Sequence, residues 1–243
     1  MRPPILALLL SMPLAAQGTD VPLGFNLPTA DQLKGWDVGL AFTHRFLQAA
    51  KDSGKDAYGL DGYAAAGLSL TVGIGPVPGL NLVVGRTADL KTFTFGVQQR
   101  LLATERVRWA LRVERFDEVV THREVALGEI GLVGGTLALP LDVTLGPVTC
   151  SLVPAYVTTT ATRQVDFGTS PAGRLASRRG GVFNVGLGVR GEVGADLGLF
   201  AELVPKPSRL PGTYHPGFAA GLTYRTFKHR FMLAASTFSG STL

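Results

Sequence analysis

The amino-acid sequence predicts an all-β fold: an antiparallel up-and-down transmembrane β-barrel of about 12 strands, with about 10 as the alternative. The clearest segment is Lys91–Arg115, in which two runs of alternating apolar and polar residues flank a polar break at Ala103–Glu105. Successive side chains of a strand point to opposite faces, so these runs are two half-apolar strands joined as a hairpin. Each run has about ten residues, enough for a tilted strand to cross a bilayer.

Composition supports the same class. Of the 243 residues 46% are hydrophobic, and the 31 glycines lie mostly inside apolar runs. Few segments repeat at helical spacing, which disfavours a helical bundle. The net charge of +5 is spread through the strand patterns, and no nucleic-acid-binding motif is present, so we expect no nucleic-acid partner. The single cysteine, Cys150, excludes an intramolecular disulfide and a thiolate metal cluster.

The N-terminus has the features of a secretory signal, predicted to span residues 1–17. Arg2 supplies the charged start, Ile5–Leu14 the apolar core and Leu14-Ala15-Ala16 the cleavage site. The apolar core has about ten residues, too few to cross a membrane as a helix, and the alternative is a buried N-terminal strand. Residues 18–34 are expected to form a polar lead-in segment with a short helical turn at Thr29–Lys34, and residues 35–243 the barrel.

The remaining strands follow from the same alternation, with turns at Gly and Pro clusters. The expected strands are Gly35–Leu47, Gly62–Ile74, Leu80–Ala88, the two halves of Lys91–Arg115, Glu124–Val143, Val148–Thr160, Gly181–Val193, Leu197–Val204, Gly217–Phe227 and Arg230–Phe238. Glu124–Val143 is either one long bent strand or two strands that turn at Gly134-Gly135. We favour two, because bacterial single-chain barrels have even strand numbers.

The less hydrophobic face of the strands favours a membrane protein. A soluble sheet usually exposes Lys, Glu and Thr on that face, whereas Gly217–Arg225 carries Gly, Ala and Thr there with a single Arg. Small residues suit the crowded interior of a narrow barrel, and the bulky face suits lipid. Aromatic residues near strand ends are expected to form interfacial girdles: Trp36, Phe46, Phe116, Tyr156, Phe227 and Phe238. A secreted soluble β-protein is the alternative.

Several short motifs resemble a known family. They are His44-Arg45-Phe46, Gly59-Leu60-Asp61, Gly85-Arg86 before Lys91-Thr92, Glu202-Leu-Val-Pro205 and His229-Arg-Phe231. In these residues the chain resembles a domain-of-unknown-function family of predicted outer-membrane β-barrels (DUF fifty-seven seventy-seven). The resemblance covers Gly35–Phe238 and implies a signal peptide and a barrel, but no activity. The expected location is the outer membrane of a Gram-negative-type bacterium, with membrane lipid and the barrel assembly machinery as partners.

Charged residues on the polar face are expected to line the lumen. They are Asp37, Arg45, Arg100, Arg108, Arg112, Glu114, Arg190, Glu192, Glu202, Arg225 and Arg230, with Arg86 depending on where its strand begins. Buried charges are tolerated when paired, so one interpretation is an ion-pair network that fills a structural barrel. The other is an Arg-lined pore that passes small anionic solutes.

Catalysis and cofactor binding are not predicted. The four histidines lack metal-ligand spacing, and no Gly-x-Ser-x-Gly elbow is present. His44 and Asp61 flank the first long loop, so an outer-membrane enzyme is the alternative function, with this pair near its rim. We expect no catalytic residue, metal or cofactor.

Overall fold

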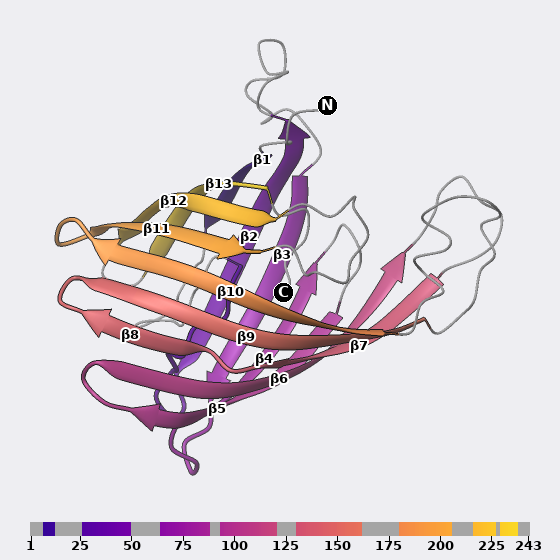
Figure 1. The fold of residues 1–243 in the computed structure, drawn as a ribbon, viewed down its shortest axis with the longest axis horizontal. Helices are drawn as coiled ribbons and strands as arrows, with labels where there is room; N and C mark the ends of the chain where they lie inside the picture. The colour runs from indigo at the N-terminus through magenta and orange to yellow at the C-terminus, as the bar shows by residue number, and fades with distance from the viewer. Residues whose placement is uncertain are drawn as a thin grey trace.

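The computed structural model describes residues 7–12, 26–49, 64–87, 93–120, 130–161, 180–205, 216–226 and 229–237, which form strands, turns and bends (Figure 1). The strands are β1 (Ala7–Met12), β2 (Val38–Ala49), β3 (Ala64–Gly73), β4 (Leu80–Thr87), β5 (Phe93–Ala103), β6 (Val107–Val120), β7 (Ile130–Ala138), β8 (Leu141–Leu145), β9 (Val148–Ala161), β10 (Gly180–Glu192), β11 (Leu197–Val204), β12 (Gly217–Arg225) and β13 (Arg230–Ser236). Among these residues no helix is long and apolar enough to cross a membrane.

All pairings are antiparallel, and the order of the strands returns to its starting point. The sheet runs β10-β11-β12-β13-β1-β2-β3-β4-β5-β6-β7-β9, and β9 pairs with β10 again. β9 and β10 are the most extensively paired neighbours, from Gly180 opposite Thr159 to Gly191 opposite Val148. The all-β antiparallel fold is therefore confirmed, and its ring of pairings is compatible with a β-barrel.

The thirteen strands occupy twelve positions, because β7 and β8 share one. Both pair with β6 on one side and β9 on the other. The predicted turn at Gly134-Gly135 is wrong, since both glycines lie inside β7 and pair with residues of β6. The strand is interrupted at Leu139-Pro140 instead, because proline has no N–H to donate to a neighbour. The twelfth position is filled by β1, from the segment predicted to be a secretion signal.

Tight turns and long connections lie at opposite ends of the ring. One end has the short turns after β3, β5, β8, β10 and β12, three of which lie together at the left of Figure 1. The strand ends at the other end of the ring border the longer connections 50–63, 88–92, 121–129, 162–179 and 206–215, whose residues lie outside the described chain. This regular alternation follows once β7 and β8 count as one strand, and it is typical of an up-and-down meander.

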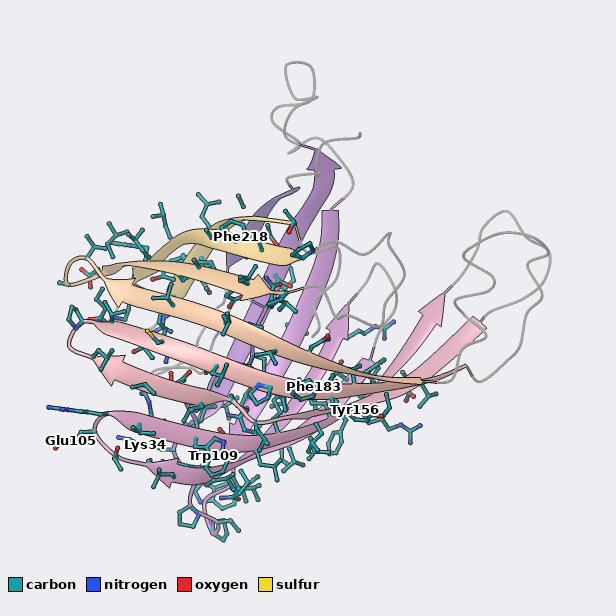
Figure 2. All side chains as sticks on the ribbon, in the orientation of Figure 1. Lys34, Glu105, Trp109, Tyr156, Phe183 and Phe218 are labelled. Atoms are coloured by element: carbon teal, nitrogen blue, oxygen red, sulfur yellow. The ribbon has the colours of Figure 1, made fainter. Side chains whose placement is uncertain are left out.

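The two faces of the sheet differ as the alternation predicts. Large apolar side chains on the outer face remain exposed, among them Trp109, Tyr156, Phe183 and Phe218, which stand on four different strands (Figure 2). The inner face holds small and polar residues, and the fully buried side chains include Asn81, Asp142 and Ser236. Phe116 was expected in the aromatic girdle, but it is buried on the inner face. Trp36 and Tyr156 are exposed, whereas Phe46, Phe227 and Phe238 lie outside the described side chains.

Candidate functional site

The segment 26–37 runs through the interior of the ring before the chain enters β2. Its apolar residues Leu27, Ala30 and Leu33 are 3%, 1% and 5% exposed. Leu27 packs in one buried cluster with Ala138 and Val153 of β7 and β9. The segment is irregular and contains no helical turn, so the prediction of one at Thr29–Lys34 is wrong. An irregular backbone cannot pair its own N–H and C=O groups, and buried groups of this kind require other partners.

Three inward side chains accept hydrogen bonds from the backbone of this segment. The N–H of Asn26 donates to Glu202 Oε2 of β11 at 2.8 Å. The N–H of Ala30 donates to Asp142 Oδ2 of β8 at 3.0 Å, and that of Leu33 to Asn81 Oδ1 of β4 at 3.0 Å. The side chains come from separate parts of the ring, so the segment crosses the interior from β11 to β4.

Gln98 of β5 binds the carbonyl groups of the same segment. Its Nε2 donates to the carbonyl oxygens of Thr29 at 2.9 Å and Asp31 at 3.1 Å. Its Oε1 accepts from Arg112 Nη1 at 3.4 Å, and Arg112 also pairs with Glu114. A neutral amide offers both donors and an acceptor, so one buried side chain links the segment to the charged residues of β6.

Asp31 is the electrostatic centre of the segment. Its two carboxylate oxygens pair with Arg108 of β6 and Arg190 of β10, each at 2.6 Å. Arg190 also lies 3.3 Å from the fully buried Asp142, which accepts a hydrogen bond from Ser151 Oγ at 2.5 Å. Two arginines and two carboxylates therefore neutralise one another across the interior. Arg108 also donates to Thr144, and Asp142 also accepts from Ala30 and Ser151, and such additional hydrogen bonds help buried ion pairs to offset their desolvation.

Glycines give this segment room. A Cβ at Gly186 would lie 2.5 Å from Leu27 Cδ2, and one at Gly188 would contact the same leucine at 3.7 Å. A side chain at Gly75 would overlap the indole of Trp36. Trp36 has a positive φ of 70°, rare for a bulky residue, and it stands where the segment turns into β2. The inner face of β10 is therefore shaped around Leu27, and the turn at Gly75 around Trp36.

A cavity of about 350 Å³ lies between this segment and the inner faces of β6 and of β8 to β13, near the tight turns. Thr29, Asp31, Arg190, Arg225 and Arg230 are among its lining residues. The hydroxyl of Thr29 is buried without a hydrogen-bond partner. Arg225 pairs with Glu192 at 3.4 Å and donates to the carbonyl of Ala195 at 3.2 Å, so the arginines at this mouth of the ring also face carboxylates and carbonyl groups.

The predicted lumen residues fall into distinct groups. Arg108 and Arg190 meet at Asp31, Arg112 pairs with Glu114, and Arg225 pairs with Glu192. Arg86 is exposed on the outer face, because it pairs opposite the exposed residues Leu68 and Phe93, so its expected place in the lumen is wrong. Of the others, Glu202 binds the N–H of Asn26, and Arg230 lines the cavity. Asp37 lies just before β2, Arg100 is exposed, and the side chain of Arg45 lies outside the description.

The family-motif residues do not gather into one site. Gly85 and Arg86 lie in β4, Glu202 in β11 with Pro205 just after it, and His229 before β13. The His229 ring stacks on Phe231, with 6.2 Å between ring centroids. His44, Arg45 and Phe46 belong to β2 but their side chains lie outside the description, as do Gly59, Leu60 and Asp61. The His44–Asp61 pair considered for catalysis therefore stays a prediction.

Sequence reasoning missed Asp31, Asn81, Gln98 and Asp142. The signal for Asp142 was present, because a single carboxylate at an inward position of an apolar strand requires a buried cation or donor. Asp31 had no such signal, since it lies in a polar stretch. Within the described residues no cluster of three or more His, Cys, Asp or Glu could hold a metal ion.

No protein-family model, curated protein or solved structure matches the chain. The resemblance to the family of predicted outer-membrane barrels stays a prediction that rests on its short motifs.

Proposed function

We propose that this chain is an outer-membrane β-barrel whose lumen is closed by residues 26–37, the N-terminal segment. We propose further that the protein passes small anionic solutes when this segment moves out of the lumen. The observation that carries the proposal is the network around residues 26–37, in which side chains of β4, β5, β6, β8, β10 and β11 bind one segment. A filled and charge-paired interior is expected of a closed channel or a structural barrel.

The outer face supports a place in lipid. Leu68, Phe95, Val113, Phe183 and Leu222 are 44–62% exposed without covering elements from the described chain, and they stand all around the ring. Such a continuous apolar surface is rare on soluble monomers and suits contact with hydrocarbon. With β1 in place, the closed pairing leaves no free sheet edge in the described ring, and a strand protein in a bilayer requires such closure.

The expected preference for anions follows from the positive charge of the inner face, which the segment partly neutralises. Among the side chains that the structure describes, the inner positions of the strands carry six arginines (Arg100, Arg108, Arg112, Arg190, Arg225 and Arg230) and four carboxylates (Glu114, Asp142, Glu192 and Glu202), a balance of 6 − 4 = +2. Asp31 reduces this excess while the segment is in place. Its departure would leave Arg108 without its carboxylate partner and Arg190 with Asp142 alone, and arginines that line a pore favour anions.

The test is single-channel conductance in a planar bilayer across a salt gradient, comparing the natural protein with Asp31→Asn. The natural protein is expected to be mostly silent. Asp31→Asn loses two charge-assisted hydrogen bonds, each worth about 1.5–3 kcal/mol, so the open fraction should rise about tenfold or more. The reversal potential of the open state should indicate anion selectivity, and replacing Arg108 and Arg190 with Glu as well should reverse it.

The control is Asp117→Asn, which removes an equal charge from an exposed pair with Arg115 and should leave the protein silent. If Asp31→Asn inserts but also stays silent, the structural barrel is the better description. If the protein shows no heat-modifiable mobility in detergent, the membrane assignment is wrong.

A further inference from the structure

One position of the ring is held by a segment that the sequence predicts to be removed. β1 lies between β13 and β2 and pairs with both, so that Ser11 stands opposite Met232 on one side and Thr43 on the other. Cleavage of the predicted signal, residues 1–17, would remove the strand that separates β2 from β13.

The two strands left behind cannot take its place by simple pairing. Each is antiparallel to β1, so β2 and β13 run parallel to each other, and eleven positions would remain of twelve. Neighbouring strands lie about 4.8 Å apart, so β2 and β13 are separated by roughly 10 Å across the vacant position. Backbone hydrogen bonds require a donor–acceptor distance of about 3 Å, and the gap is too wide for them.

Vacant strand edges are unfavourable inside a membrane. Backbone groups along Phe42–Ala49 and Met232–Ser236 would lose their partners, and hydrocarbon offers no other donor or acceptor to replace them. Lipid tails offer no hydrogen bonds. A second copy inserted in the same direction presents edges that also run parallel to these two, so it cannot reproduce the antiparallel pairing of β1.

We propose that in the processed protein the gap between β2 and β13 is a strand-acceptor site, which takes one extended segment of another polypeptide. This inference rests on the proposed membrane function. The guest runs antiparallel to both strands, from the end with the long connections toward the end with the tight turns, because that is the direction of β1.

The neighbouring side chains define what the guest carries. Positions 8 and 10 of β1 stand opposite Ala235 and Leu233, and Leu233 is 42% exposed on the outer face. Positions 7 and 9 stand opposite Ser236 and Ala234, which are fully or almost fully buried on the inner face. The guest therefore has bulky apolar residues at outward positions and small residues at inward positions, the same pattern as the strands of this chain.

The first experiment uses residues 1–243, expressed with the predicted signal and purified from the outer membrane. Intact mass should show the loss of residues 1–17. In a Cys150→Ser background, the variant Thr43→Cys with Met232→Cys reports the gap, because both positions stand opposite Ser11. Disulfides form only when the Cα atoms are about 4.4–6.8 Å apart, so this pair should not cross-link. Thr223→Cys with Met232→Cys is the matched control, since those residues face each other directly and should cross-link.

The second experiment supplies a guest. A biotinylated peptide with the sequence of residues 5–14 and the change Leu9→Ala, which makes both inward positions small, should bind the purified protein saturably, and a scrambled peptide should not. A cysteine at peptide position 8 should cross-link to Ala235→Cys, whereas a cysteine at position 10 should cross-link to Leu233→Cys instead. This register reports antiparallel insertion beside β13.

Three outcomes overturn the strand-acceptor site: retention of residues 1–17, a disulfide between positions 43 and 232, or failure of the peptide to bind. Heat-modifiable mobility and conductance of the same preparation report the proposed function separately. A protein that inserts and gates as proposed, and yet forms the 43–232 disulfide, overturns this inference alone.

Discussion

The two walls of the ring present different surfaces to the interior. On one wall β4, β5, β6, β8, β10 and β11 present long polar side chains, and Asn81, Gln98, Arg108, Asp142, Arg190 and Glu202 each bind the N-terminal segment. On the other wall β2, β3, β12 and β13 present small residues, such as Ala41, Gly67, Ala219 and Ala234, all buried.

The difference reflects what each wall contacts. An irregular segment brings backbone N–H and C=O groups into the interior, and those groups need hydrogen bonds that only polar side chains on the wall can supply. The small side chains of the other wall, such as Ala41 and Ala234, have no polar groups to offer to residues 26–37, and they allow close packing there. In this ring, the polar residues of the inner face therefore mark where the segment is bound.

The largest effect is expected for Asp142→Ala on the polar wall. The change removes the acceptor for Ala30 N–H and Ser151 and one partner of Arg190. Breaking a buried ion pair costs about 3–5 kcal/mol, and the low end applies because Arg190 keeps Asp31. Urea unfolding in detergent, followed by heat-modifiable mobility, measures this loss. An unchanged unfolding midpoint would show that the polar wall is not needed for stability.

Gly186→Val should displace the N-terminal segment without removing a charge. A Cβ at this position would lie 2.5 Å from Leu27 Cδ2, and overpacking of this kind costs about 1–3 kcal/mol. We expect faster proteolysis after the segment is released and a larger open fraction in conductance. Gly194→Ala is the control, because nothing lies within 4 Å of a Cβ there. Equal behaviour of the two variants would contradict the packing of Leu27 against β10.

Gly221→Ala tests the wall of small residues. The new Cβ would lie 2.7 Å from the Cα of Ala234 on β13, so the strands must separate locally, at a cost of about 1–3 kcal/mol. Because Gly221 has no side chain that binds the segment, unfolding should become easier while conductance stays low. An open channel in this variant would mean that both walls control the segment.

Asp117→Asn should have the smallest effect. Asp117 pairs with Arg115 at 3.4 Å, and the two side chains are 45% and 69% exposed. Exposed pairs of this kind contribute about 0–1 kcal/mol, so the unfolding midpoint should stay close to that of the natural protein. A shift as large as that of Asp142→Ala would show that burial does not distinguish the two carboxylates.

The sequence by itself determined the strands and the two faces. β11 spans Leu197–Val204, the same residues that the alternation predicted, and the hairpin of β5 and β6 lies within and just beyond Lys91–Arg115. Periodicity is a local property, and one buried face is enough to fix which residues point inward. The same reasoning brought Arg108, Arg112 and Arg190 to the inner face.

Only the tertiary structure decided what fills the interior. Asp31 and Arg190 are 159 residues apart, and nothing local in the lead-in segment predicts that pairing. Pairing with β6 and β9 also decided that β7 and β8 occupy one position, since a proline in an apolar run fits a turn and an interrupted strand equally well. Side-chain partners and strand neighbours are determined only when distant parts of the chain meet. An alternating pattern predicts which face a residue lies on, but it does not predict which residues pack against that face.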